Sequence, residues 1–365
     1  MTAGTAAPAA AADTRSGDDD SRGHGGRHAA TRTAMADMIR AEDLPGTIAG
    51  VREDGDTWSA AVGVADTATG RPRSPRERFR IGSVTKTFTA TVVLQLQAEG
   101  RLGLDDTVER WLPGTVPDDG IHRPGITIRQ LLNHTSGLYS YDDDPQMIRL
   151  LASPDFMAHR YDTYRPEDLV RLAVSHPRLF DPGEKPQYSN TDYLLAGMVI
   201  AKVTGRPYGE EIEQRIIRPL GLSATTLPGT AAGLPRPHAL GYSKLFGGSK
   251  TPLETTELNP SWAGAAGEMI STTADVGRFY SALMRGKLLP QAELDEMVPA
   301  DGAPGLGIGS VTLACGVTLW GHTGGIHGSS TVAVTTRDGR HTAVFNTNAD
   351  WADGERRLAE AEFCR

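Results

Sequence analysis

The sequence predicts an α+β fold, in which one antiparallel sheet is built from both chain ends and flanked by helices, with an all-helical lobe inserted between the ends. Residues 47–66 and 316–348 alternate apolar and polar positions as strands do. From about 104 to 284 the chain has mostly helical spacing and loops. Strands near both termini with helices between them favour one sheet assembled from the two ends.

Composition sets the expected domain boundaries. Residues 1–32 contain no large apolar side chain after Met1, so we expect a disordered tail rich in alanine, glycine and aspartate. The remaining residues, 33–365, are expected to form one domain. Its sheet lobe and helical lobe are expected at about 33–80 with 286–365, and at about 81–285.

Local patterns justify the elements in turn. Apolar residues at helical spacing predict helices at 32–42 and from Ser83 to Glu99, and Gly100 follows the second in a helix-stop position. Two early strands are joined by a hairpin turn at 53–56. The C-terminal part predicts a strand, a hairpin with the turn "RDGR" and a final helix, at 316–322, 330–348 and 354–363.

The overall charge and hydropathy exclude two kinds of partner. A formal net charge of −8 argues against binding the anionic backbone of a nucleic acid. No run of about 18 apolar residues occurs, so we expect no membrane-spanning helix.

The stretch "FRIGSVTKTFTA" places Ser83 three residues before Lys86. A serine hydroxyl is a weak nucleophile and needs an adjacent base. The spacing puts Lys86 one turn along the same helix face, but a lysine acts as a base only if burial lowers its pKa. A helix N-terminus also favours developing negative charge at the serine. The motif alone fits either a nucleophile with its base or a polar helix start beside an ordinary lysine.

A second motif, Tyr188-x-Asn190, lies in "EKPQYSNTDY", just before a helix expected to start near Thr191. A tyrosine can carry a proton between nucleophile and leaving group when a nearby cation stabilises its phenolate. The alternative is a core tyrosine followed by a helix cap from Asn190.

A third motif, His322-Thr323-Gly324, is expected to end a strand in "LWGHTGGIHG". The glycines allow the backbone to approach a substrate closely. Histidine suits proton transfer or electrostatic support near neutral pH, although a histidine at a strand edge is often structural.

Together and in this order, the motifs resemble those of the serine penicillin-recognising enzymes, which carry Ser-x-x-Lys, Tyr-x-Asn and then Lys-Thr-Gly or His-Thr-Gly on a sheet-edge strand. The resemblance is strongest to the serine DD-carboxypeptidase and class C β-lactamase branch, which has the histidine form. It extends from about Asp43 to Cys364 and includes "LLNHTSGLY", "SWAGAAGEMISTTAD" and "GHTGG". It implies the β-lactamase/DD-peptidase fold and identifies Ser83 as the nucleophile.

The resemblance implies a role for each motif residue. Ser83 would attack a carbonyl and form an acyl-enzyme, while Lys86 and Tyr188 share the proton transfers. Asn190 would orient Lys86 and the substrate amide, and His322 would keep the site electropositive.

The same resemblance implies the surroundings of the substrate. The backbone N–H groups of Ser83 and Gly325 would form the oxyanion hole, beside Thr323 and Gly324 on the strand. Trp262 is interpreted either as a pocket wall or as a packing residue.

Two other features are interpreted as structural. His134 in "NHTSGLY" imitates the third motif but has a structural role in the family. The acidic runs "YDDDP" and "LDD" are expected to be solvated turns.

The two cysteines of the chain, Cys315 and Cys364, are either free buried thiols or a disulfide. They lie where the carboxypeptidase branch has its disulfide, so the resemblance favours the bond. A disulfide requires an oxidising compartment, so we expect an extracytoplasmic protein, although the chain shows no signal-peptide pattern.

Two positions depart from the carboxypeptidase pattern. In that branch the carboxylate of the terminal D-alanine meets an arginine six residues before the first cysteine and a threonine directly after His-Thr-Gly. This chain has Gly309 and Gly325 at those positions. The loss of a charged hydrogen bond weakens binding by roughly 1.5–3 kcal/mol, so recognition of a free carboxylate stays open.

The leading hypothesis is a serine acyl-enzyme hydrolase or acyltransferase, most similar to a D-alanyl-D-alanine carboxypeptidase, acting on peptides or amides with a D-residue. The alternatives are a D-aminopeptidase or amidase, an esterase and a peptide cyclase. A non-catalytic penicillin-binding receptor is the alternative of another class. We expect a monomer that reacts covalently with β-lactams and needs neither a metal nor an organic cofactor.

Overall fold

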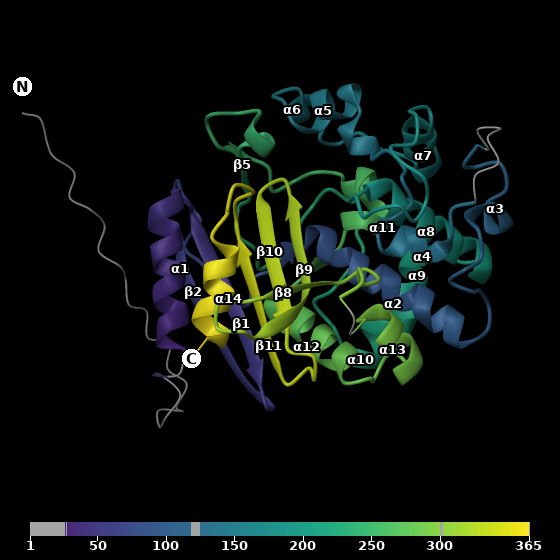
Figure 1. Ribbon diagram of the computed structural model, residues 1–365. Helices are drawn as coiled ribbons and strands as arrows, with labels where there is room; N and C mark the ends of the chain where they lie inside the picture. Colours follow the sequence, from purple (N-terminus) through teal and green to yellow (C-terminus); the bar gives the residue numbers. More distant parts are fainter. Residues whose placement is uncertain (1–25, 27, 118–124, 300–301, 365) are drawn as a thin grey trace, which may run out of the picture.

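A seven-stranded antiparallel sheet joins the two ends of the chain (Figure 1). The computed structural model describes residues 26, 28–117, 125–299 and 302–364. The strands lie in the order β3-β2-β1-β11-β10-β9-β8. Their bounds are Gly46–Glu53 (β1), Asp56–Asp66 (β2), Arg71–Pro72 (β3), Gly309–Thr312 (β8), Thr318–Ile326 (β9), Ser329–Thr335 (β10) and His341–Thr347 (β11).

The pairing of β1 with β11 closes the sheet across nearly the whole length of the chain. In this antiparallel pair Ala49 lies opposite Phe345, and both are buried. Because side chains alternate along a strand, Ile48 packs on one face of the sheet and Ala49 on the other. The expectation of one sheet assembled from both termini is therefore confirmed.

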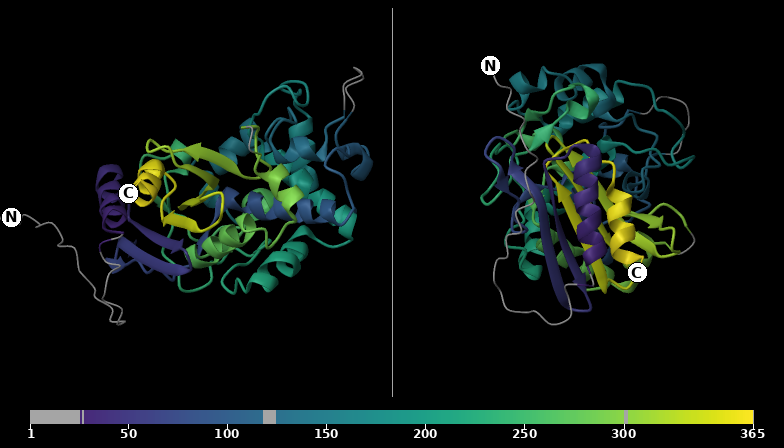
Figure 2. Two further views of the ribbon diagram at one scale, coloured as in Figure 1. Left: turned by 60° about the horizontal axis from the view of Figure 1, so that its bottom comes forward. Right: turned by 90° about the vertical axis from the view of Figure 1, so that its left-hand side faces the viewer.

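Helices cover both faces of this sheet. Helices α1 (Ala29–Glu42) and α14 (Glu355–Phe363) lie side by side on one face (Figure 2). Helix α12 (Thr273–Met284) packs against β1 and β11 on the other face. A Cβ atom at Gly50 of β1 would lie 2.7 Å from the Thr273 side chain, so glycine is needed where α12 approaches the sheet.

The helical lobe is centred on α2 (Thr85–Ala98) and α8 (Asn190–Thr204), which pack against each other and are buried along most of their length. Further helices surround them: α3 (Val108–Trp111), α4 (Ile128–Leu132), α5 (Pro145–Leu151), α6 (Phe156–His159), α7 (Pro166–Val174), α9 (Tyr208–Ile212), α10 (Arg218–Leu220), α11 (Gly264–Gly267) and α13 (Gln291–Met297). Short strand pairs connect the lobes: β4 (Phe79–Arg80) with β7 (Ile270–Ser271), and β5 (Tyr242–Ser243) with β6 (Leu253–Glu254). Among the described residues, no helix is both long and apolar enough to span a membrane.

The structure corrects the expected boundaries at three places. Helix α1 begins at Ala29, and Thr31 and His28 are buried, so the ordered domain starts before residue 33. The reason is the buried Glu362 carboxylate, which accepts a hydrogen bond from Thr31 Oγ1 at 2.6 Å and lies 3.0 Å from His28 Nδ1. The rest of the expected tail, 1–25 and residue 27, lies outside the described residues.

The other two corrections concern helices near the lobe boundary. Helix α12 was expected in the helical lobe, but its apolar face packs on the sheet. Helix α13 lies in the segment expected to belong to the sheet lobe, yet it packs against α2. Local spacing shows that one face of such a helix is buried but does not identify the partner.

A disulfide joins Cys315, in the turn between β8 and β9, to Cys364 at the end of α14. The two Cα atoms are 5.7 Å apart, and the bond closes a loop with a sequence separation of 49 residues. The expected pairing is confirmed, and it ties the last helix to the sheet.

Replacing both cysteines by serine is expected to lower the free energy of unfolding by about 4 kcal/mol, because the unfolded chain loses a cross-link that closes a long loop. Denaturant unfolding of the variant and of oxidised and reduced wild type measures this. The variant and reduced wild type should have the same free energy of unfolding. Equal free energies for oxidised and reduced wild type would contradict the prediction.

Candidate active site

Ser83 lies in a tight turn between a short strand and the central helix. The strand β4 ends at Arg80, a 3-10 turn spans Gly82–Val84, and α2 follows from Thr85. Gly82 has φ +52°, and a Cβ atom there would lie 2.8 Å from both the nitrogen and the oxygen of Gly325. Glycine therefore allows the serine turn to lie directly against β9.

The edge of β9 that faces this turn is left open by its neighbour. Strand β8 pairs only with Thr318–Gly321 of β9, so the third motif from His322 onward is not covered by β8. A Cβ atom at Gly324 would lie 2.0 Å from Ile81 O and 3.0 Å from Ser83 N. The motif lies inside β9, which continues to Ile326, and not at the strand end that the sequence predicts.

Lys86, the second residue of α2, is fully buried one turn after Ser83, and its Nζ has three partners. It lies 3.0 Å from Ser83 Oγ, 2.7 Å from Asn190 Oδ1 and 2.8 Å from Ala266 O. Burial lowers the pKa of Lys86 to about 7, although the carboxylates of Asp142 and Asp192 oppose this shift. When Lys86 is a neutral amine, its two N–H groups can donate to Asn190 Oδ1 and Ala266 O, which are both acceptors. Its lone pair is then left to accept the proton of the Ser83 hydroxyl.

Tyr188 also contacts the nucleophile. Its hydroxyl donates to Ser83 Oγ at 2.8 Å, and Lys86 Nζ lies 4.8 Å from the centre of its ring. Burial of the hydroxyl raises the pKa of Tyr188, so the phenol is protonated at neutral pH and is a proton donor in the resting site. The structure thus brings Ser83, Lys86 and Tyr188 into one hydrogen-bonded cluster.

Asn190, the first residue of α8, connects this cluster to a carboxylate that the sequence analysis missed. Its Nδ2 donates to Asp142 Oδ2 at 2.7 Å, while its Oδ1 accepts from Lys86. Asp142 also accepts a hydrogen bond from Ser140 Oγ, and Ser140 Oγ accepts from the Asn190 backbone N–H.

The acidic run "YDDDP" is therefore not a set of solvated turns, which corrects the earlier expectation. Tyr141 is fully buried, Asp142 is half-buried beside Asn190, and Asp144 is buried as the cap of α5. The run "LDD" is also structural in part, because Asp106 accepts hydrogen bonds from Trp111 Nε1 and Gly103 N. These contacts come from distant or loop residues, which local composition does not reveal.

The charge of Asp142 is predicted to tune the base. Replacing Asp142 by asparagine keeps an oxygen for Asn190 but removes a charge that raises the pKa of Lys86. We expect the acid limb of the pH–rate profile to move to lower pH by about half a unit or more, with little change in the plateau. Asp143→Asn, in the same turn but exposed, is the matched control; an identical shift in both variants would contradict a specific role of Asp142.

His322 lies on β9 beside this cluster and is partly exposed. Burial and the neighbouring Lys86 ammonium lower the pKa of His322 to about 3, so its imidazole is neutral near pH 7. Its Nδ1–H donates to the Thr323 carbonyl oxygen, and its ring centre lies 6.3 Å from that of Tyr188. The lowered pKa disfavours a positive charge on His322, so the electropositive role that the resemblance implies stays a prediction.

His134 lies behind the cluster and has a supporting place, as the sequence analysis predicts. Its Nδ1 is 3.0 Å from Asp192 Oδ2, and its ring lies 4.4 Å from that of Tyr188. Burial lowers the pKa of His134 to about 3 and raises that of Asp192, whose other oxygen accepts from Ser136 Oγ at 2.5 Å. Through His134, this buried set packs against the Tyr188 ring.

The residues expected around the substrate are partly exposed. Thr323 and Gly325 face outward from β9, whereas Gly324 is buried. A Cβ atom at Gly325 would meet nothing within 4 Å, and one at Gly309 only the Gly321 carbonyl oxygen, at 3.9 Å. Trp262 is only 9 % exposed and packs edge-on against His327, so packing is the better of its two interpretations.

The fold and this cluster define a class of protein: a serine hydrolase whose nucleophile lies in the turn before a central helix and is contacted by a lysine of that helix and by a tyrosine. The Beta-lactamase family model matches residues 28–363. The chain belongs to this family, which confirms the resemblance drawn from its motifs.

Three relatives illustrate the range of the family. The crystal structure of a D-stereospecific amidohydrolase from a Streptomyces species is 50% identical, with a TM-score of 0.86, and the match covers 92% of this chain and 98% of that one. The D-amino acid amidase of Ochrobactrum anthropi SV3 is 28% identical, with a TM-score of 0.77, and 91% and 97% are covered. Penicillin-binding protein 4* of Bacillus subtilis is 28% identical over 332 residues, which are 82% of this chain and 67% of that protein.

Proposed function

We propose that the chain is a D-stereospecific amidohydrolase that forms an acyl-enzyme on Ser83 from amides or peptides of D-residues. The observation that carries the proposal is the position of Ser83 Oγ, 3.0 Å from Lys86 Nζ and 2.8 Å from the Tyr188 hydroxyl. The 50% identity to a D-stereospecific amidohydrolase supports the choice of substrate.

The proposed acylation begins when neutral Lys86 accepts the hydroxyl proton of Ser83 as Oγ forms a bond to the substrate carbonyl carbon. The backbone N–H groups of Ser83 and Gly325 would stabilise the oxyanion. Tyr188 donates its proton to the leaving amine as the C–N bond breaks, and Lys86 returns a proton to the phenolate. Water then attacks the carbonyl carbon of the ester, and the proton transfers run in the reverse direction. This step releases the acid and restores the Ser83 hydroxyl.

This proposal places amides ahead of the carboxypeptidase reaction named first by the sequence analysis. Gly309 and Gly325 leave open space where the carboxypeptidase branch has an arginine and a threonine for the substrate carboxylate. An amide has no such carboxylate to be bound. D-Alanyl-D-alanine carboxypeptidase activity stays the second candidate because the match to a penicillin-binding protein covers most of the chain.

The test compares three substrates at equal concentration: D-phenylalanine amide, L-phenylalanine amide and an acyl-D-Ala-D-Ala peptide. We expect release of ammonia from the D-amide, little from the L-amide and little D-alanine from the peptide. Fast release of D-alanine with no turnover of the D-amide would replace this proposal by the carboxypeptidase. No turnover of any substrate, together with a stable benzylpenicillin adduct, would favour a penicillin-binding receptor.

The disulfide also supports an extracytoplasmic location.

A further inference from the structure

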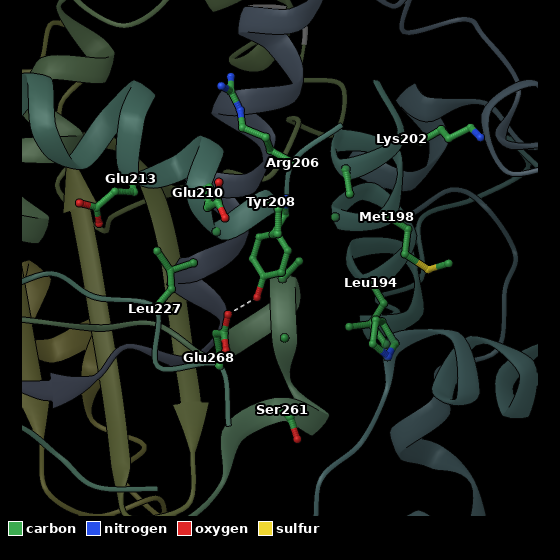
Figure 3. Close-up of a pocket in the computed structure, with 18 of the residues that line it drawn as sticks. Leu194, Met198, Lys202, Arg206, Tyr208, Glu210, Glu213, Leu227, Ser261 and Glu268 are labelled. Atoms are coloured by element: carbon green, nitrogen blue, oxygen red, sulfur yellow. Dashed lines mark hydrogen bonds between the residues drawn. The ribbon is translucent and has the colours of Figure 1, made fainter. Parts of the chain in front are cut away.

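A cavity outside the Ser83 cluster is lined in part by Gly264 and Ala265 of α11, and Figure 3 shows it in close-up. Its volume is about 1080 Å³, which is in the size range of small-molecule sites. Ser83, Lys86 and Tyr188 are not among the residues that line it. Leu194, Met198 and Leu227 form much of its apolar wall.

A buried carboxyl group forms the polar end of this cavity. Glu268 is 4% exposed, and the Tyr208 hydroxyl donates to its Oε1, as Figure 3 shows. Burial raises the pKa of Glu268, and the Gly229 backbone N–H also donates to it. Arg80 is the cation that influences Glu268, but the two form no ion pair within the described part of the chain. Nη2 of Arg80 instead donates to the carbonyl oxygens of Ala232 and Leu258.

The charges at the mouth of the cavity are mixed. Three acids and three bases line it, namely Glu167, Glu210, Glu213, Lys202, Arg206 and Arg218. Two of the bases are already engaged, because Arg206 donates to Glu211 at 2.6 Å and Arg218 to Glu213 at 3.1 Å. The mouth therefore does not strongly select a ligand by charge, whereas the inner end offers one carboxyl group that forms no ion pair with any of the described residues.

We propose that this cavity binds an amphipathic primary amine, with its ammonium group on Glu268 and its apolar body along α8 and Leu227. A buried carboxylate is stabilised by an opposite charge that also forms hydrogen bonds, and an ammonium group supplies both. The apolar wall excludes a small hydrophilic cation as the best ligand, because such a cation would leave the wall exposed to water.

Occupation of the cavity bears on the catalytic lysine through α11. Ala265 of this four-residue helix lines the cavity, and the next residue, Ala266, accepts the hydrogen bond from Lys86 Nζ. A bound amine thus contacts the element that positions the base. Amines are also the leaving groups of the proposed amide hydrolysis, so a product amine bound in this cavity could regulate the enzyme. Such regulation rests on the proposed function, whereas the binding of an amine to the cavity does not.

Binding is tested by isothermal titration of Ser83→Ala with hexylamine at pH 7.5, and with 1-hexanol as the neutral molecule of equal length. Using the inactive variant separates binding from catalysis, so a failure here does not bear on the proposed function. We expect hexylamine to bind about tenfold or more tightly than 1-hexanol. Adding Glu268→Gln, which keeps an oxygen for Tyr208, should remove this difference.

A second variant locates the site. Met198→Trp, added to Ser83→Ala, fills the apolar part of the cavity on α8 and should abolish hexylamine binding, while denaturant unfolding checks that the chain still folds. Equal binding of hexylamine with glutamate and glutamine at position 268 would overturn the proposal. If Met198→Trp still binds hexylamine, the amine lies outside this cavity and the proposal is wrong. The proposal is also wrong if Ser83→Ala shows no detectable binding of hexylamine.

Discussion

Replacing Ser83 by alanine is expected to reduce hydrolysis of D-residue amides by about 10⁴-fold or more. The acyl-enzyme cannot form without the hydroxyl oxygen, and nothing else in the cluster is a comparable nucleophile. The change removes one half-buried atom from a turn whose backbone is fixed by Gly82, and Lys86 keeps Asn190 and Ala266 as partners. The chain should therefore fold normally, which denaturant unfolding checks beside kcat/KM.

The matched control is Ser310→Ala, which removes an exposed serine of β8 outside the hydrogen-bonded cluster. It should keep full activity. Intact mass after incubation with a benzylpenicillin-type β-lactam gives a second measurement, because an adduct should be absent from Ser83→Ala whatever the preferred substrate. Equal turnover by wild type and Ser83→Ala, or an adduct on both, would remove Ser83 from the mechanism.

The strands and the central helix could be predicted because their patterns are local. The alternation through β1 and β2, and the turn between β10 and β11, lie within short stretches of sequence. The partners of α12 and α13 could not be predicted in this way. An apolar stripe indicates that a helix is buried, but the surface that covers it is decided by packing with residues far along the chain.

In the candidate site, too, contacts between residues close in sequence could be predicted, whereas contacts between distant residues could not. Ser83 and Lys86 are one helical turn apart, so their contact follows from spacing alone. Asp142 reaches Asn190 across 48 positions and lies in an acidic run that resembles a solvated loop, so no local signal identifies it. The charge state of His322 depends on burial and on Lys86, which only the three-dimensional arrangement fixes. The types of the motif residues predicted the reaction chemistry, whereas the pKa values of these residues depend on burial and on neighbours that only the folded structure shows.

Lys86 is expected to set the acid limb of the pH–rate profile. The base must be neutral to accept the Ser83 proton, and burial lowers its pKa to about 7. Activity should therefore be high above this pKa and fall as the pH decreases through about 7, because protonated Lys86 has no lone pair. Replacing Lys86 by methionine, which has similar volume, should reduce kcat/KM by about 10³-fold and abolish this limb. Lys287→Met, at an exposed lysine after α12, is the control and should retain both the activity and the limb.

The two histidines and the tyrosine of the cluster are not expected to produce the same limb. The pKa values of His134 and His322 are both lowered to about 3, and that of Tyr188 is raised above its usual value. A limb near pH 7 that disappears in Lys86→Met therefore points to the lysine, and to neither histidine nor Tyr188, as the base. If the limb persists in Lys86→Met, another group accepts the proton, and the short contact between Lys86 and Ser83 has a structural role.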